Sequence, residues 1–226
     1  MSRPSDPHAK SRLLEAAERV FCEKGLDRAK VEDITSLAGL SKGAFYLHFD
    51  SKGDAFKELL SGVLAQVQMR IDGCGPPSLE HGLEQALETW LERDVELFEF
   101  VWKNRALMRI TLEGGRSADY QHLIEHFASY AQTETEGLLR QGIAAGLYRK
   151  DLDVEVAAAF IAGGYDRFAR QLVRESKKPD LRKRLRELRW LVITGAGTPQ
   201  LITCLQQLQP EKADTDTAAT LALPTT

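Results

Sequence analysis

Residues 41–48 combine small, cationic, hydroxyl-bearing and aromatic side chains in one short stretch. Gly43 and Ala44 permit close approach to another molecule, and the Lys42 ammonium can donate hydrogen bonds to guanine. Ala44 and Leu47 can contact the methyl group of thymine, while neighbouring hydroxyl, imidazole and ammonium groups can hold phosphates. This combination predicts a surface that reads double-stranded DNA. The candidate residues are Ser41, Lys42, Gly43, Ala44, Tyr46, Leu47, His48 and Lys52.

Three short helices must position these side chains, and the sequence predicts them over 8–24, 31–38 and 42–48. Apolar residues recur at helical spacing in the first two, and a glycine follows each. Ser41 is the candidate N-cap of the third. The tight turn at Gly39 that separates the second helix from the third is typical of a helix-turn-helix module.

Helical spacing continues through most of the chain, and no stretch that alternates apolar and polar residues predicts a strand. A capping-box pattern, Ser51 with Asp54, opens a fourth helix, and Ser78 and Asp180 are candidate caps of later ones. These predicted helices cover 51–71, 78–91, 95–103, 106–113, 118–145, 154–175 and 180–195. The sequence therefore predicts an all-α fold.

Composition excludes several classes of protein. Hydrophobic residues make up 43% of the 226, enough for a sizeable core, and the longest uncharged apolar run, 156–164, is too short to cross a membrane. No secretory signal is seen at the N-terminus, and three cysteines fit a reduced, cytoplasmic protein. Net charge is zero over 1–60, −7 over 61–169 and +4 over 170–226. Any contact with nucleic acid must therefore be local.

Three runs of sequence carry a resemblance to a known family: AAERVFCEKG at 16–25, AGLSKG at 38–43 and FYLHFDSK at 45–52. With the residues between them, they resemble the DNA-binding region of TetR-type transcriptional regulators. The resemblance covers about the first sixty residues, and beyond them only chain length and helical layout agree.

One residue departs from the family's pattern. Such regulators usually have Thr or Ser just before the second helix, as N-cap and phosphate contact, whereas this chain has Lys30. The lost or shifted cap costs about 1 kcal/mol, but the cation could itself reach a phosphate. Lys30 is thus a further candidate for DNA contact, and the alternative is an ordinary exposed lysine.

The resemblance implies a homodimer whose two recognition helices enter successive major grooves of a palindromic operator. The last two helices would form the dimer interface. The sequence supports this arrangement, since residues 154–173 are apolar around most of the helix circumference and should be buried on two sides.

The resemblance also implies a small-molecule pocket in the helices after the DNA-binding module. Apolar walls with few polar groups are typical of such pockets, and the same aromatic residues could instead fill a core. The candidate ligand-binding residues are Trp90, Phe98, Trp102, Met108, Phe127, Tyr130, Tyr165 and Phe168.

A second motif suggests different chemistry. His122, Glu125 and His126 match the HxxEH pattern of some metallopeptidases, and both histidines have metal-ligand spacing. On a helix, however, both lie roughly 120–160° from the apolar face, and no third ligand is apparent. We expect exposed histidines and no bound metal.

The sequence thus predicts a helix-turn-helix domain over 1–51, a helical ligand-binding and dimerisation domain over 52–208, and a disordered tail over 209–226. We expect a cytoplasmic transcriptional repressor, not an enzyme, with no cofactor and no membrane partner. Its expected partners are operator DNA, a second copy of the chain and a small, largely apolar effector. The alternatives are a metal-dependent hydrolase centred on the HxxEH motif and a DNA-binding regulator with no ligand.

Overall fold

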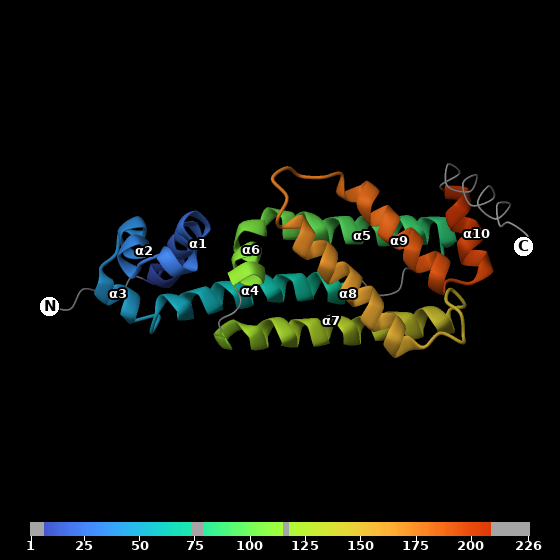
Figure 1. The fold of residues 1–226 in the computed structure, drawn as a ribbon, viewed down its shortest axis with the longest axis horizontal. Helices are drawn as coiled ribbons and strands as arrows, with labels where there is room; N and C mark the ends of the chain where they lie inside the picture. The colour runs from blue at the N-terminus through green and yellow to red at the C-terminus, as the bar shows by residue number, and fades with distance from the viewer. Residues whose placement is uncertain (1–6, 74–78, 115–117, 209–226) are drawn as a thin grey trace, which may run out of the picture. The chain divides into compact units, whose positions relative to one another are not determined.

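The computed structural model describes residues 7–73, 79–114 and 118–208, and in these ranges it contains ten α-helices and no strand (Figure 1). This confirms the predicted all-α fold. The helices are α1 (Ala9–Arg28), α2 (Val31–Ala38), α3 (Lys42–Tyr46), α4 (Lys52–Asp72), α5 (Leu83–Lys103), α6 (Arg105–Gly114), α7 (Ala118–Ala144), α8 (Val154–Leu172), α9 (Leu181–Ala196) and α10 (Pro199–Leu208). No helix within the described ranges is long and apolar enough to span a membrane.

The chain forms two compact units, which are described separately. Unit 1 comprises Met1–Met69, Phe100–Ser129 and Arg167–Ser176, and unit 2 comprises Arg70–Glu99, Tyr130–Asp166 and Lys177–Thr226. The predicted domain boundary after residue 51 falls within unit 1 and stays a prediction. The predicted tail over 209–226 lies outside the described residues.

Unit 1 is held together by α1, which packs against α2, α3 and α6. Fully buried aromatic side chains fill the space between these helices and the start of α4. The rings of Phe21 and Phe56 meet edge-to-face at 5.5 Å, and those of Phe45 and Phe49 lie 5.4 Å apart. Aromatic pairs of this kind add about 0.5–1.5 kcal/mol beyond the area they bury. This core fixes the orientation of α3 relative to α1 and α2.

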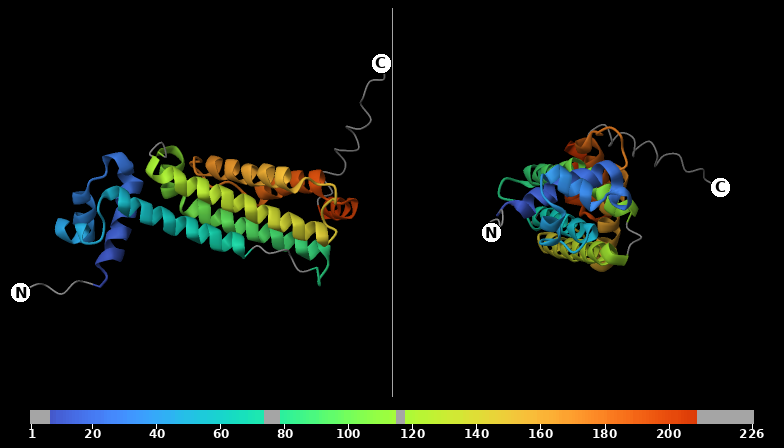
Figure 2. Two further views of the ribbon diagram at one scale, coloured as in Figure 1. Left: turned by 90° about the horizontal axis from the view of Figure 1, so that it is seen from below. Right: turned by 90° about the vertical axis from the view of Figure 1, so that its left-hand side faces the viewer.

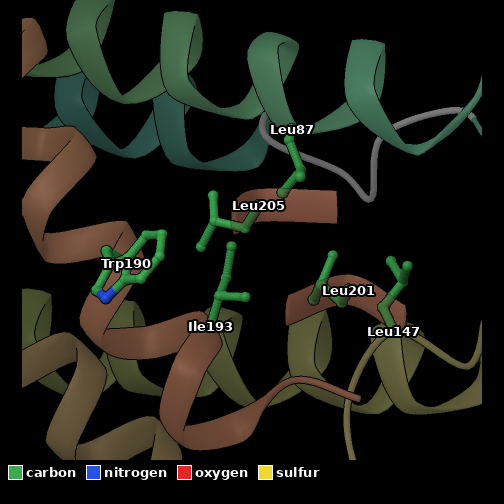
Figure 3. Packing of buried hydrophobic residues seen from close by; sticks show 6 residues of the cluster. All are labelled: Leu87, Leu147, Trp190, Ile193, Leu201 and Leu205. Carbon is green, nitrogen blue, oxygen red and sulfur yellow. The ribbon is translucent and has the colours of Figure 1, made fainter. Parts of the chain in front are cut away.

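Unit 2 has its own core at the end formed by α9 and α10. Figure 3 shows the buried side chains of Trp190 and Ile193 from α9 facing Leu201 and Leu205 from α10, with Leu87 of α5 beside them. Figures 1 and 2 show α10 next to the beginning of α5. Helix α10 therefore closes this core from one end.

Helix α10 was not predicted, although its sequence carries signals for it. Pro199 stands at the first helical position, where its missing N–H costs nothing. Leu201 and Leu205 follow on one face and are buried. The Thr198 N–H also donates to the carbonyl of Leu147 at 2.9 Å, which fastens the turn before α10 to the rest of unit 2.

Helix α5 differs from its prediction at both ends. It begins at Leu83 and continues without interruption to Lys103, so the two predicted stretches are one helix. The N–H of Gly82 donates to the carbonyl of Leu79 in a turn, and Gly82 has a φ of 88°, which ends the turn outside the helical region. The predicted cap, Ser78, lies outside the described residues.

Candidate nucleic-acid interface and ligand region

Helix α3 is anchored on one side and exposed on the other. Its predicted cap is confirmed, since Ser41 Oγ accepts a hydrogen bond from the Ala44 N–H at 3.1 Å. The Phe45 side chain is fully buried against the core of unit 1. Tyr46 is 50% exposed and Leu47, just past the end of the helix, is 81% exposed. Leu47 therefore contributes little to the core, and its predicted contact with DNA stays a prediction.

The turn before α3 is built around Gly39, in the left-handed region at φ 64° and ψ 34°. The Leu40 N–H donates to the Thr35 carbonyl at 2.9 Å, which closes the end of α2. The Arg12 guanidinium reaches from α1 and donates to the carbonyl of Ala38. This contact could not be predicted from local spacing, because 26 residues separate its partners.

Lys42 is held by a partner within the module. Its Nζ lies 2.6 Å from Glu32 Oε1 on α2, and both side chains are exposed. Hydrogen bonding to Glu32 raises the pKa of Lys42, and the same bond lowers the pKa of Glu32. Lys42 must therefore leave Glu32, or share its protons, before it can donate to a base. Glu32 was not among the predicted site residues.

Lys52 has a structural role besides its predicted one. Its Nζ donates to the carbonyls of Asp27 at 2.9 Å and Ala29 at 3.0 Å. The start of α4 is thereby tied to the link between α1 and α2. Contact with a phosphate would use the remaining proton and stays a prediction.

Lys30 precedes α2 as expected, and its side chain does not cap the helix. Its N–H donates to Asp33 Oδ2 at 3.0 Å, so the acidic half of a capping box remains. Asp33 also pairs with Lys24 at 2.8 Å. The exposed Lys30 side chain leaves its predicted phosphate contact open.

Gly43, Ala44 and His48 complete the predicted surface. A Cβ atom added at Gly43 would lie 3.8 Å from Ser41 Oγ, an ordinary contact, so the fold itself does not require glycine there. Ala44 is half-buried, and the half-buried His48 ring lies 6.4 Å from that of Phe49. All nine predicted DNA-contacting residues belong to unit 1.

The predicted ligand-binding residues are divided between the two units. Phe98 and Tyr165 are neighbours in unit 2, with ring centroids 5.9 Å apart, and Trp90 stacks on Tyr148 there at 6.5 Å. Tyr130, also in unit 2, donates its hydroxyl to Asp72. Trp102, Met108, Phe127 and Phe168 belong to unit 1. The structure therefore brings Phe98 next to Tyr165 within unit 2, and the ligand-binding role of the eight residues stays a prediction.

Two charged residues that were not among the predicted site residues lie among the aromatic residues of unit 2. Arg189 on α9 pairs with Asp94 on α5, and Tyr165 on α8 donates to the same carboxylate oxygen at 2.9 Å. We call Asp94, Tyr165 and Arg189 the Arg189 cluster. Burial, and then the charge of Asp94, raises the pKa of Tyr165 well above its usual 10, so its hydroxyl stays protonated.

The HxxEH residues do not form a site. His122, Glu125 and His126 are all exposed on α7. Among the residues whose placement is described, no group of three or more His, Cys, Asp or Glu could hold a metal ion.

Comparison with known proteins places these features in context. Residues 13–59 match the profile of the family described as bacterial regulatory proteins, tetR family. The chain is similar to the HTH-type transcriptional repressor KstR2 of Rhodococcus jostii strain RHA1, 29% identical over 67% of this chain and 74% of that protein. KstR2 of Mycobacterium tuberculosis strain H37Rv is 30% identical over 66% of this chain and 74% of that protein.

Solved structures share the fold. The structure of the ketosteroid transcriptional regulator KstR2 of Mycobacterium tuberculosis covers 84% of this chain and 95% of its own, with a TM-score of 0.58 and 24% identity. That of the fatty acid degradation regulator FadR from Bacillus halodurans covers 84% and 97%, with a TM-score of 0.63 and 21% identity. Both similarities extend well beyond the first sixty residues.

Proposed function

This chain belongs to the tetR family of bacterial regulatory proteins, and from that premise we propose that it is a repressor that binds a palindromic operator as a homodimer. As a member of this family it is a DNA-binding transcriptional regulator and not an enzyme. The proposal places it in the cytoplasm, where its DNA lies. The observation that carries the repressor proposal is the exposed surface of α3. Phe45 anchors one side of this helix in the core, and Leu47, just after the helix, is exposed.

On DNA, α3 would lie in the major groove with its N-terminal end towards the bases. Gly43 and Ala44 allow the backbone to come close, and Lys42 would exchange Glu32 for a guanine. Tyr46, His48 and Lys30 would hold the flanking phosphates, which fix the register without reading sequence. The Ser41 cap and the Arg12 contact keep α3 in place before DNA arrives.

A second copy of the chain would cover the exposed apolar face of α8 and α9. Phe160 on α8 is 76% exposed and Leu191 on α9 is 66% exposed, which is unusual for large apolar side chains. Gly164 and Gly195 lie one helical turn further along the same faces, and a Cβ atom at either would meet open space. Small residues beside exposed apolar ones allow two helices to approach closely.

A small effector would bind among the helices after the DNA-binding module and release the operator. Two structural neighbours are a ketosteroid transcriptional regulator and a fatty acid degradation regulator, and ketosteroids and fatty acids are both largely apolar. An effector can release DNA only if it binds the DNA-free arrangement more tightly than the DNA-bound one. The effector is therefore expected to change the spacing of the two recognition helices.

Selection of binding sites from random duplex DNA tests the proposal. We expect a palindromic consensus whose half-sites lie about one helical turn apart, bound by two copies of the chain. Affinity should fall steeply with salt, because phosphate contacts release counterions. Recovery of no consensus, or of a single half-site bound by one copy, would overturn the operator model.

A further inference from the structure

The Arg189 cluster is a charged group in surroundings that stability alone does not explain. The side chains of Arg189 and Asp94 are only 13% and 15% exposed. Taking two charges out of water is costly, and well-packed apolar side chains often serve as well or better. The cluster joins α5, α8 and α9.

One N–H donor of the cluster is left unpaired among the residues that the structure describes. Arg189 Nε is buried, and in the part of the chain that the structure describes it has no hydrogen-bond partner. A guanidinium presents five N–H donors in a rigid fork, of which Asp94 engages one nitrogen, Nη2. Buried donors are almost always paired, so an unpaired one requires an explanation.

Aromatic rings lie close to the guanidinium that carries this donor. The Trp90 ring centroid lies 5.4 Å from Arg189 Cζ, and the Tyr148 ring stacks on the Trp90 ring with 6.5 Å between centroids. Phe98 lies against the ring of Tyr165 at 5.9 Å. Apolar walls around one directed polar group are the usual composition of a small-molecule site.

The charges and the hydrogen-bond donors around Arg189 indicate what kind of group could pair with its Nε. Asp94 already balances the charge of Arg189, so a second anion beside the pair would be repelled by the carboxylate. The Tyr165 hydroxyl is used on Asp94 and is not available to a ligand. The free N–H therefore favours an uncharged oxygen acceptor.

We propose that Arg189 Nε binds the carbonyl oxygen of a small ring-containing ligand whose apolar body packs against Trp90 and Phe98. This inference rests on the proposed function, since it names the chemical class of the effector. It adds to the expected apolar ligand one oxygen at a defined position.

Isothermal titration of the full-length chain without DNA tests the proposal. The probes are the acetyl, isopropenyl and carboxylate derivatives of benzene, naphthalene and phenanthrene. Acetyl and isopropenyl groups have the same shape, but only the former accepts a hydrogen bond. With the best-fitting ring system, we expect the acetyl compound to bind about tenfold more tightly than its isopropenyl counterpart, and more tightly than the carboxylate.

Two variants and one matched control assign the preference to the donor. Arg189→Lys keeps a positive charge beside Asp94 but has no Nε, and Arg189→Met removes the charge as well. Both should bind the acetyl and isopropenyl compounds within about twofold of each other. Arg182→Met is the control, because Arg182 pairs with Glu88 and Glu92 between the same two helices at the surface, and it should keep the preference. Circular dichroism confirms folding, and Arg189→Lys serves if Arg189→Met unfolds.

Equal binding of the acetyl and isopropenyl compounds would overturn the inference, as a water molecule would then satisfy Arg189. So would a preference that survives in Arg189→Lys, tighter binding of the carboxylate, or no binding by any probe. Measuring whether each probe releases the protein from its operator distinguishes failure of the carbonyl site from failure of the proposed function. Release by isopropenyl compounds alone would sustain the function and refute the carbonyl site. Binding that depends on Arg189 but does not release the operator would sustain the carbonyl site and refute the proposed release by an effector.

Discussion

At the scale of single residues, the Glu32–Lys42 ion pair sets the state of the DNA-reading surface before DNA binds. Lys42 is the main candidate for base contact, and Glu32 holds it at 2.6 Å. In Glu32→Gln the cation is released and a negative charge near the phosphates is removed. We expect operator affinity to rise about two- to fivefold, with little change in thermal stability because the pair is exposed. Fluorescence anisotropy with the selected operator measures this.

Glu136→Gln is the matched control for this change. Glu136 pairs with the exposed Arg140 within α7, so its loss removes the same charge without freeing a DNA-contacting group. Its operator affinity should match that of the wild type. Weaker binding or unchanged binding by Glu32→Gln would show that Glu32 does not compete with DNA for Lys42.

Lys42 and Tyr46 should differ in what they contribute. Lys42→Ala should relax the preference for one base pair by about tenfold, because a donor to a base edge reads sequence. Tyr46→Phe should weaken binding to all duplexes to a similar extent, because a contact with a phosphate does not read the base sequence. Binding to a set of operators with single base changes, measured for both variants, distinguishes the two roles. The same loss across that set for Lys42→Ala would remove its assignment as a base-reading residue.

What the sequence predicted at this scale depended on local spacing. Ser41 could be assigned as a cap because its partner, Ala44, is three residues away. The Glu32–Lys42 and Asp94–Arg189 pairs could not be predicted. Their partners lie on different helices, and only the packing of those helices brings the charges together.

At the scale of elements, two glycines only four residues apart in sequence have different reasons to be there. Gly39→Ala forces a side chain into the left-handed region at φ 64° and brings its Cβ atom to 3.2 Å from Arg12 Nη2. We expect the variant to lose about 1–2 kcal/mol of stability. Gly43→Ala should keep or gain about 0.5–1 kcal/mol, since alanine favours a helix. It should nevertheless weaken operator binding, because its methyl group enters the DNA-facing surface.

Thermal unfolding and operator binding of both variants separate the two roles. Gly39→Ala should lower the melting temperature, whereas Gly43→Ala should lower only the affinity for the operator. If Gly43→Ala binds the operator like the wild type, α3 does not approach DNA through Gly43.

Helix α10 illustrates the limit of prediction at this scale. Pro199 and the leucines after it indicate a helix. The apolar face is short, however, and the polar residues around it make its helical pattern hard to recognise in the sequence.

At the scale of the whole molecule, function depends on two copies, since one recognition surface reads only half of a palindrome. Phe160→Glu combined with Leu191→Glu places two charges on the exposed face of α8 and α9. Because both side chains are exposed, the single chain should remain folded. We expect the variant to sediment as a monomer and to bind the operator about a hundredfold or more weakly, since the two half-sites no longer act together.

Gln141→Glu, an exposed position on α7, adds a charge away from that face and should remain a dimer with wild-type affinity. Analytical ultracentrifugation of the double variant and of this control measures the oligomeric state, and a full and a half operator measure the loss of cooperation. The double variant should bind a half operator as well as the wild type does, because α3 is untouched. A dimer that persists in Phe160→Glu with Leu191→Glu would place the interface elsewhere, and the exposed apolar face would then require another partner.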